Sequence, residues 1–239
     1  MLDMHFHVIP NVDDGAENIE ESLRLLEMQK EDGVDAVIAT PHFYPQMADI
    51  SEYFEKVDQQ LELLKKHCGS NLPHIFKGFE VRYFNGISTT TEIDKMVLGG
   101  SNYILVELPY ESEITNYMLD EIANIYDNVG IVPILAHVER YYKYNNFSKV
   151  VKLLNKGEVL AHVNASSICS RLYGKQTLDL IKKGIITFVA SDAHSVNGRP
   201  PLLKSAYKVI SDKLGEEYKN EFIKNSDKLL NIIKKVEEK

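Results

Sequence analysis

The sequence has few cysteines and no long hydrophobic run, and each shortage excludes a class of protein. Cys68 and Cys169 lie outside any C-x-x-C motif, so we expect neither a disulfide framework nor a cysteine-based zinc site. No window approaches the roughly 18 consecutive apolar residues of a membrane span, and only Met1 and Leu2 precede Asp3, which leaves no room for a signal peptide. We therefore expect a cytoplasmic protein with reduced thiols and no direct insertion into a membrane.

Positive charge is also scarce, and this argues against a nucleic-acid partner. The chain has 27 Lys and Arg against 35 Asp and Glu, a formal net charge of -8, and its only basic cluster is the lysine-rich final segment. Binding to a phosphate backbone requires a positive surface, so neither a nucleic-acid binder nor a nuclease is expected. An anionic substrate would have to be held by metal ions or by a few arginines.

Common motifs for phosphate and acyl chemistry are missing as well. The chain has no G-x-x-x-x-G-K-[ST], no G-x-G-x-x-G and no G-x-S-x-G. The residues six positions after the two cysteines are His74 and Lys175, whereas the loop of thiol-dependent phosphatases has arginine there. A cysteine nucleophile acting on phosphate is therefore not expected.

Short apolar runs alternate with helical patterns along the 239 residues. Seven runs are typical of strands, over residues 2–8, 34–40, 74–80, 102–108, 130–136, 158–164 and 185–191. The helical patterns cover residues 18–33, 51–67, 113–130, 147–157, 174–184 and 216–239. Such alternation predicts parallel strands with crossover helices. We expect a single α/β domain over residues 1–239, a closed or nearly closed barrel like a TIM barrel, with 213–239 as closing helices outside it. A doubly wound open sheet is the alternative.

Side chains able to bind metals lie at or near the carboxyl ends of the predicted strands. His5 and His7 alternate on the first strand, so both point to one face. The others are Asp14, His42, Glu80, Glu107, His137, Asp192 and His194. The carboxyl ends of barrel strands form one rim, where active sites are built. Asn164 also ends a strand, where it either orients a ligand or satisfies backbone groups of a turn.

Nine imidazoles and carboxylates gathered at one rim predict a metal centre. Buried together without cations they would repel and desolvate one another, and divalent ions relieve that cost. The ligands are too many for one ion, so we expect two or three ions with a bridging carboxylate; mixed nitrogen and oxygen ligands suit manganese, iron or zinc. We expect no metal role for His67, His74 and His162. We expect structural roles for Glu17, Glu111 and Glu139.

Two of the few arginines lie in loops that leave this rim. Arg140 follows His137, and Arg199 follows His194. A guanidinium group matches the oxygens of a phosphate and supplies the positive charge that the chain as a whole lacks. A surface salt bridge is the alternative role for each.

These features together resemble the PHP (polymerase and histidinol phosphatase) superfamily of metal-dependent phosphoesterases. The segments that carry the resemblance are DMHFHVIPNVDDGAE, ATPHFYP, GFEVRY, ILVELPY, AHVERY, VNASSI and SDAHSVNGRPP. They run from residue 3 to residue 201, and within the superfamily they are most similar to the manganese-dependent protein-tyrosine phosphatases of bacterial capsule and exopolysaccharide operons. The resemblance implies a distorted seven-stranded β/α barrel that holds three metal ions, manganese before iron or zinc.

The resemblance also implies roles for individual residues. It assigns His5, His7, Glu80 and Asp192 to one ion, Glu80, Glu107 and His137 to a second, and Asp14, His42 and His194 to a third. It implies as catalytic residues Arg140, Arg199, Asp192 and His42, with the two arginines binding the substrate phosphate.

The function implied is hydrolysis of phosphotyrosine on a protein. The implied partner is the tyrosine-rich tail of a cognate bacterial tyrosine kinase, and the implied process is regulation of capsular or exopolysaccharide synthesis. One alternative keeps the metals and changes the substrate to histidinol phosphate or another small phosphomonoester. Another is a metal-stabilised scaffold that binds phosphopeptides without hydrolysing them. The sequence is compatible with a homo-oligomer.

Overall fold

The computed structural model describes residues 1–46, 50–110, 113–143 and 147–238. Its strands are β1 (Leu2–Phe6), β2 (Ala36–Ala39), β3 (His42–Phe43), β4 (His74–Lys77), β5 (Glu80–Arg82), β6 (Tyr103–Glu107), β7 (Val132–Leu135), β8 (Leu160–Asn164) and β9 (Phe188–Ala190). Its helices are α1 (Ile19–Glu31), α2 (Ile50–His67), α3 (Asn116–Val129), α4 (Phe147–Leu154), α5 (Ala165–Cys169), α6 (Gly174–Lys182), α7 (Leu203–Leu214) and α8 (Glu216–Glu237). No helix within these ranges combines the length and the apolar character that crossing a membrane requires.

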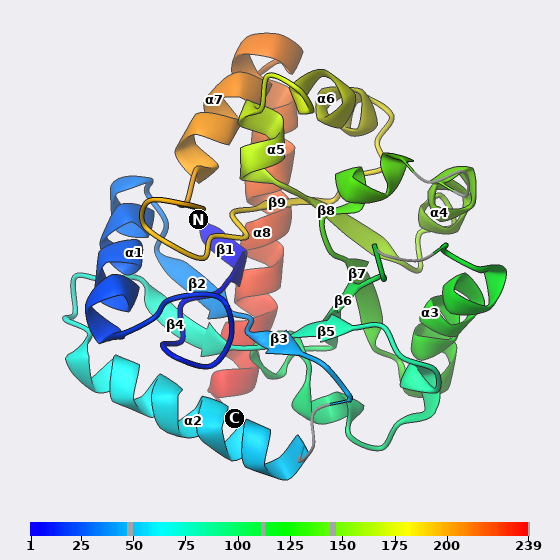
Figure 1. The fold of residues 1–239 in the computed structure, drawn as a ribbon. Coiled ribbons are helices and arrows are strands. Elements are labelled where there is room, and N and C mark those ends of the chain that lie inside the picture. Colours follow the sequence, from blue (N-terminus) through cyan, green and yellow to red (C-terminus); the bar gives the residue numbers. More distant parts are fainter. Residues whose placement is uncertain (47–49, 111–112, 144–146, 239) are drawn as a thin grey trace.

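The strands are parallel and form a curled sheet surrounded by helices, which confirms the predicted α/β class (Figure 1). One part has the order β1-β2-β4 and the other the order β3-β5-β6-β7-β8-β9. The curl brings the chain after β9 to β1: His5 O accepts from Asp192 N at 2.9 Å, and His7 N donates to Ala193 O at 3.0 Å. Residues from the two ends of the chain therefore lie side by side.

The predicted strand over residues 74–80 is two strands, β4 and β5, in different parts of the sheet. Gly78 lies between them, and a Cβ on it would come within 2.8 Å of Leu98 Cδ2 and 3.0 Å of Ile38 Cγ2. A larger residue here would force the side chains of Leu98 or Ile38 to shift, so the close packing favours glycine. Glu80 therefore begins β5, whereas the sequence analysis placed it at the end of a strand. The two-residue β3 was too short to be predicted.

A buried polar network ties β1 to α1 and to the segment after β9. Asp3 Oδ1 accepts from Ser191 N at 3.0 Å, and Gln29 Nε2 donates to Asp3 Oδ2 and, at 3.3 Å, to Ser191 Oγ. Burial raises the pKa of Asp3, although its hydrogen bonds oppose the rise. The network adjoins His5 on one chain segment and Asp192 on the other, so it fixes their relative positions.

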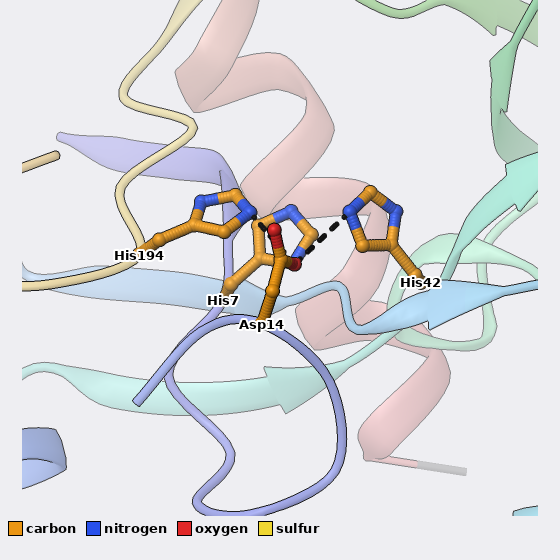
Figure 2. A group of neighbouring side chains, drawn as sticks. All are labelled: His7, Asp14, His42 and His194. Atoms are coloured by element: carbon orange, nitrogen blue, oxygen red, sulfur yellow. Dashed lines mark ion pairs between the residues drawn. The ribbon is translucent and has the colours of Figure 1, made fainter. Parts of the chain in front are cut away.

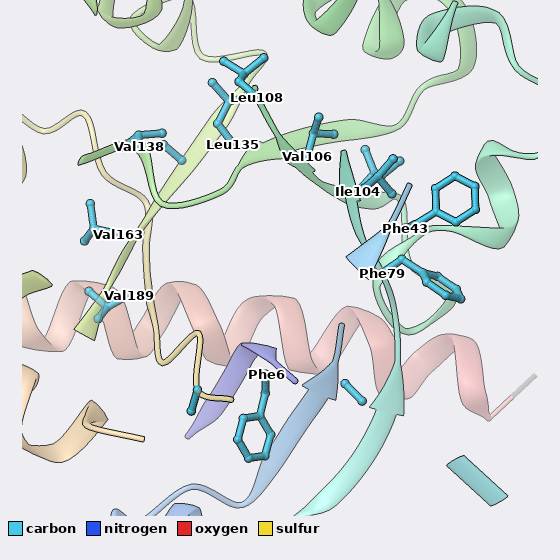
Figure 3. Packing of buried hydrophobic residues seen from close by; sticks show 14 of the residues in the cluster. Phe6, Phe43, Phe79, Ile104, Val106, Leu108, Leu135, Val138, Val163 and Val189 are labelled. Atoms are coloured by element: carbon cyan, nitrogen blue, oxygen red, sulfur yellow. The ribbon is translucent and has the colours of Figure 1, made fainter. Parts of the chain in front are cut away.

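Alternate residues of the strands enter two hydrophobic clusters. The larger cluster includes Val106, Leu135 and Val163 and lies between the strands and most of the helices (Figure 3). The smaller one joins Met4, Ile38, Leu105, Ile134 and Phe188 to Leu229, Leu230 and Ile233 of α8. Burial on both faces explains why the strand sequences are almost continuously apolar.

The closing segment is longer than predicted. Helix α7 begins at Leu203, ahead of the expected start at residue 213, and α8 is one continuous helix that runs behind the strands in Figure 1. The start of the closing segment is marked by apolar residues that are buried at helical spacing: Leu203, Ala206, Tyr207 and Ile210.

Candidate metal centre

The structure brings all nine predicted ligands together at one end of the strands. Ligand atoms of eight of them form three overlapping groups, and within each group these atoms lie within 4.8 Å of one another. We name them the inner group (His5, His7, Glu80, Asp192), the outer group (His7, Asp14, His42, His194) and the third group (His42, Glu80, Glu107). The ninth predicted ligand, His137, lies beside Glu80 and Glu107. His7, His42 and Glu80 each belong to two groups, and of these Glu80 has two carboxylate oxygens with which to bridge neighbouring ions.

The inner group is almost sealed from solvent, with exposed fractions of 0–3%. His5 Nε2 and His7 Nε2 lie 2.9 Å apart. Glu80 Oε2 lies 3.2 Å from the first nitrogen and 3.4 Å from the second, and Asp192 Oδ1 lies 3.4 and 3.5 Å from them. Two imidazoles and two carboxylates thus converge on one buried point.

The donor set fits a cation at that point. Asp13 Oδ2 lies 2.7 Å from His7 Nδ1, so Nδ1 donates and Nε2 directs its lone pair into the group. Glu80 Oε2 is buried without a hydrogen-bond partner in the described part of the chain, although His42 Nδ1 is only 2.9 Å away. Imidazole nitrogens and carboxylate oxygens that converge on one buried point are an arrangement that suits a divalent ion, and a bound ion would displace the protons held among them.

The outer group opens to solvent through Asp14. Figure 2 shows Asp14 between the rings of His194 and His42, and its Oδ1 lies 3.3 Å from Nε2 of each. The Asp14 side chain is 65% exposed, and its bonds to His194 and His42 lower its pKa. Burial lowers the pKa of His42, but Asp14 and Glu80 outweigh this and raise it to about 11. Burial and the neighbouring His7 lower the pKa of His194.

The third group gains a further nitrogen from His137. His137 Nε2 lies 2.8 Å from Glu80 Oε1 and 3.3 Å from Glu107 Oε1, so it touches the two carboxylates with which the resemblance grouped it. His137 and Asp192 have φ values of 35° and 51°, in the left-handed region. Such a conformation costs of order 1–3 kcal/mol in a residue other than glycine and is found mainly at functional sites.

The two predicted arginines meet the metal ligands at Asp192. Arg140 Nη2 lies 2.8 Å and Arg199 Nη2 2.7 Å from Asp192 Oδ2. Asn164 Nδ2 donates to the same oxygen at 2.6 Å, so this asparagine orients a candidate ligand. The arginine side chains are 37% and 42% exposed, which leaves them accessible to a substrate.

The sequence analysis missed two supporting residues. Asp13 holds His7 Nδ1 and also accepts from the backbone N of His42 at 3.0 Å. Arg82 Nη1 donates to Glu107 Oε2 at 2.8 Å. Asp13 was overlooked because it is adjacent to Asp14 in VDDG, and only Asp14 was predicted as a metal ligand. The second had a usable signal, since Arg82 lies two residues after Glu80 on one strand and therefore faces the same way.

The three histidines expected to have no metal role lie outside all three groups. His67 Nδ1 bonds to Leu63 O at 2.8 Å on α2. His74, at the start of β4, pairs with Glu237 at 3.4 Å. His162 differs from both, because it is fully buried and its Nε2 lies 2.9 Å from Nδ1 of the candidate ligand His5.

The glutamates expected to be structural also lie outside these groups where they are described. Glu17 is exposed, and Glu111 falls outside the described residues. Glu139 is buried, and its Oε1 accepts from Asn164 N at 3.2 Å and from Ser167 Oγ at 2.8 Å. Burial raises the pKa of Glu139.

Comparison with known proteins places the chain in a family. Residues 1–231 match the family described as capsular polysaccharide synthesis, CpsB/CapC. The putative tyrosine-protein phosphatase CapC of Staphylococcus aureus is 31% identical over 96% of this chain and 91% of its own length. Tyrosine-protein phosphatase CpsB of Streptococcus agalactiae serotype III is 28% identical over 96% of this chain and 98% of its own.

A solved structure has the same fold. It comes from the crystal structures of YwqE from Bacillus subtilis and CpsB from Streptococcus pneumoniae, which are described as metal-dependent tyrosine phosphatases. It superposes with a TM-score of 0.81 and 24% identity, covering 97% of this chain and 94% of the solved one. On the match over nearly its whole length, this chain belongs to the CpsB/CapC family of capsular polysaccharide synthesis proteins.

Proposed function

We propose that this protein is a metal-dependent phosphatase that hydrolyses phosphotyrosine on a protein and acts in capsular or exopolysaccharide synthesis. The observation that carries the proposal is the double role of Asp192, whose Oδ1 faces the inner group while its Oδ2 binds Arg140 and Arg199. A phosphate bound by these arginines would therefore lie against the metal ligands. The names of the CapC and CpsB relatives, both tyrosine-protein phosphatases, support the same reaction.

The proposed cofactor is a cluster of two or three divalent ions, with manganese expected first and iron or zinc as alternatives. The inner, outer and third groups would each hold one ion, with His137 completing the third. The ligands are imidazoles and carboxylates, a set that suits these metals.

We further propose that the strands form one distorted seven-stranded barrel in a single domain. Strands β2 and β3 follow each other directly, and β4 and β5 are divided only around Gly78, so each pair counts as one barrel strand. The bonds of His5 and His7 to the segment after β9 support closure of the ring. The metal groups would then lie at the carboxyl-terminal rim, the usual position of active sites in such barrels.

The side chains of the site have separate tasks in the proposed reaction. Divalent ions bound there would neutralise phosphoryl oxygens and make hydroxide available near neutral pH. Arg140 and Arg199 donate to the equatorial oxygens of the phosphoryl group, where negative charge gathers in the transition state. His42, 15% exposed at the boundary of the site, would take part as a ligand through Nε2, which lies 3.3 Å from Asp14 Oδ1, while its Nδ1 lies 2.9 Å from Glu80 Oε2. Tyrosinate, whose conjugate acid has a pKa of about 10, needs less protonation than a serine alkoxide.

The surroundings of Arg140 favour a protein substrate. A cavity of about 510 Å³ adjoins this arginine and is lined also by Tyr110, Tyr142 and Tyr173. These tyrosines are 41–57% exposed, so aromatic surface is available to a peptide beside the phosphate site. The proposed partner is the phosphotyrosine-containing tail of a cognate bacterial tyrosine kinase.

The test is phosphate release by metal-stripped protein with and without added Mn²⁺. Three substrates are compared: a tyrosine phosphopeptide, the matched phosphoserine peptide and histidinol phosphate. We expect Mn²⁺-dependent release chiefly from phosphotyrosine. Release chiefly from histidinol phosphate would retain the metals and overturn the substrate, and binding of the phosphopeptide without release from any substrate would overturn catalysis.

A further inference from the structure

We propose that His162 is a positioning residue of the metal centre: it fixes His5 in the ring tautomer that binds metal and holds the backbone of His137. The proposal rests on the metal site proposed above. His162 is on β8, is fully buried, and packs edge-on to His5 with ring centroids 4.9 Å apart and an interplanar angle of 85°.

The hydrogen bonds around His162 Nε2 leave one arrangement of protons. The backbone N–H of His137 donates to this nitrogen at 3.3 Å, and because a backbone N–H can only donate, Nε2 must be unprotonated. The contact of 2.9 Å between His162 Nε2 and His5 Nδ1 is then a bond in which His5 donates. The remaining nitrogen of His5, Nε2, therefore directs a lone pair toward His7 and Glu80 in the inner group.

His162 thus does for His5 what Asp13 does for His7. In both cases a partner on the far side of the ring accepts from Nδ1 and leaves Nε2 free for a metal. The difference is that Asp13 is a carboxylate, whereas His162 accepts through an imidazole nitrogen and carries no negative charge. It therefore orients a ligand without adding another negative charge to a site that already holds three buried carboxylates, Glu80, Glu107 and Asp192.

A purely structural role explains His162 poorly. Its Nδ1 is buried and has no hydrogen-bond partner among the residues that the structure describes. Leaving a polar atom unpaired costs about 1–3 kcal/mol, which an aliphatic residue at this position would avoid. The other bond of His162 also serves the site, because it anchors the left-handed backbone of His137, the nitrogen ligand beside the third group.

The test measures Mn²⁺ binding directly, by electron paramagnetic resonance of the free ion, in three variants. His162→Phe keeps a ring of similar shape and removes the acceptor. His162→Gln places an amide oxygen close to the position of Nε2 and restores an acceptor. Val163→Ala is the control, because it alters the same strand on the opposite face, in the larger cluster. Circular dichroism establishes that each variant is folded.

We expect His162→Phe to weaken Mn²⁺ binding by about 10- to 100-fold, the usual cost of losing such a partner, and His162→Gln to recover most of that loss. Wild-type affinity in folded His162→Phe would overturn the proposal, as would equal losses in all three variants. If His162→Phe does not fold, ¹⁵N NMR of the wild-type protein loaded with Zn²⁺ tests the proposal instead. We expect His5 to be protonated on Nδ1 and bound to the metal through Nε2. Metal bound through Nδ1, with the proton on Nε2, would overturn the proposal.

These readouts do not depend on turnover. If wild-type protein binds Mn²⁺ but releases no phosphate from phosphotyrosine, the proposed function fails, while the comparison of the phenylalanine and glutamine variants still decides the role of His162.

Discussion

The inner and outer groups use the same kinds of side chain in opposite surroundings. Glu80 and Asp192 of the inner group are 1% and 3% exposed, whereas Asp14 of the outer group is 65% exposed. His7 belongs to both groups, so the two sites are adjacent, and they differ in their access to water. The inner group has two imidazoles and two carboxylates and the outer group three imidazoles and one carboxylate, so both burial and charge separate the two sites.

Because the inner group is buried, its carboxylates need a balancing positive charge more than the exposed Asp14 of the outer group does. A carboxylate removed from water is costly unless it is paired, and removing one member leaves the others unpaired. Asp14 loses little hydration, and water can replace it as a ligand. We therefore expect the inner ion to bind tightly and to be essential, and the outer ion to exchange readily.

The largest expected effect is that of Asp192→Asn. Asparagine tolerates the left-handed backbone at this position, so the change removes the charge while preserving the conformation. The inner group loses a ligand, and Arg140 and Arg199 lose their shared anion. We expect kcat/KM for a tyrosine phosphopeptide to fall by about 10³-fold or more, since metal stabilisation of the transition state is worth several kcal/mol.

The matched control for this change is Asp212→Asn, which neutralises an aspartate in an exposed pair with Lys208 and should leave kcat/KM unchanged. Excess Mn²⁺ should not rescue Asp192→Asn. Activity within tenfold of wild type would remove Asp192 from the proposed machinery.

A smaller effect is expected for Asp14→Asn in the outer group. The variant loses an exposed ligand that water can replace, so we expect activity to fall by about 10- to 100-fold at limiting Mn²⁺. Raising the Mn²⁺ concentration should restore much of the loss, in contrast to Asp192→Asn. Steady-state rates across a Mn²⁺ titration of both variants make the comparison. A loss in Asp14→Asn as large and as resistant to Mn²⁺ as that in Asp192→Asn would show that exposure does not separate the groups.

Much of the site could be predicted because parallel strands bring their carboxyl ends to one edge. That rule gathers His5, Glu107, His137 and Asp192 although they are far apart in sequence. The alternation of His5 and His7 on one strand needs only the period of a strand. The parallel α/β class followed from the same alternation of apolar runs and helical patterns.

What the sequence did not show depends on contacts between distant segments. The break between β4 and β5 lies at Gly78, which packs closely against Leu98, and no local sequence pattern predicts that contact. His162 resembles any apolar-flanked histidine in sequence, and its contact with His5 exists only once β8 and β1 face each other. The choice between Asp13 and Asp14 likewise needed the loop conformation, which turns the first toward His7 and the second toward His42.

The smallest expected effect is the difference in pH dependence between the two groups. In protein stripped of metal, burial lowers the pKa of His7, but Asp13 more than offsets this and raises it to about 9; His42 rises to about 11 in the same way. Because these pKa values lie above the ordinary 6.5, the ion pairs stabilise the stripped protein fully below pH 6.5. That contribution is lost as pH rises through about 9 for His7 and about 11 for His42.

A metal ion must displace these protons, so its affinity rises with pH throughout the range below these pKa values, by about tenfold per pH unit for each proton released. The outer group contains both His7 and His42, whereas the inner group contains only His7 of the two, so an outer ion displaces two of these protons and an inner ion one. We therefore expect the outer ion to leave first as pH falls from about 8 to about 6. Mn²⁺ titrations of wild type and of Asp14→Asn across this range separate the two sites, because the variant reports the inner site nearly alone. Equal pH dependence in the two proteins would mean that the exposed carboxylate of Asp14 does not set the proton affinity of the outer group.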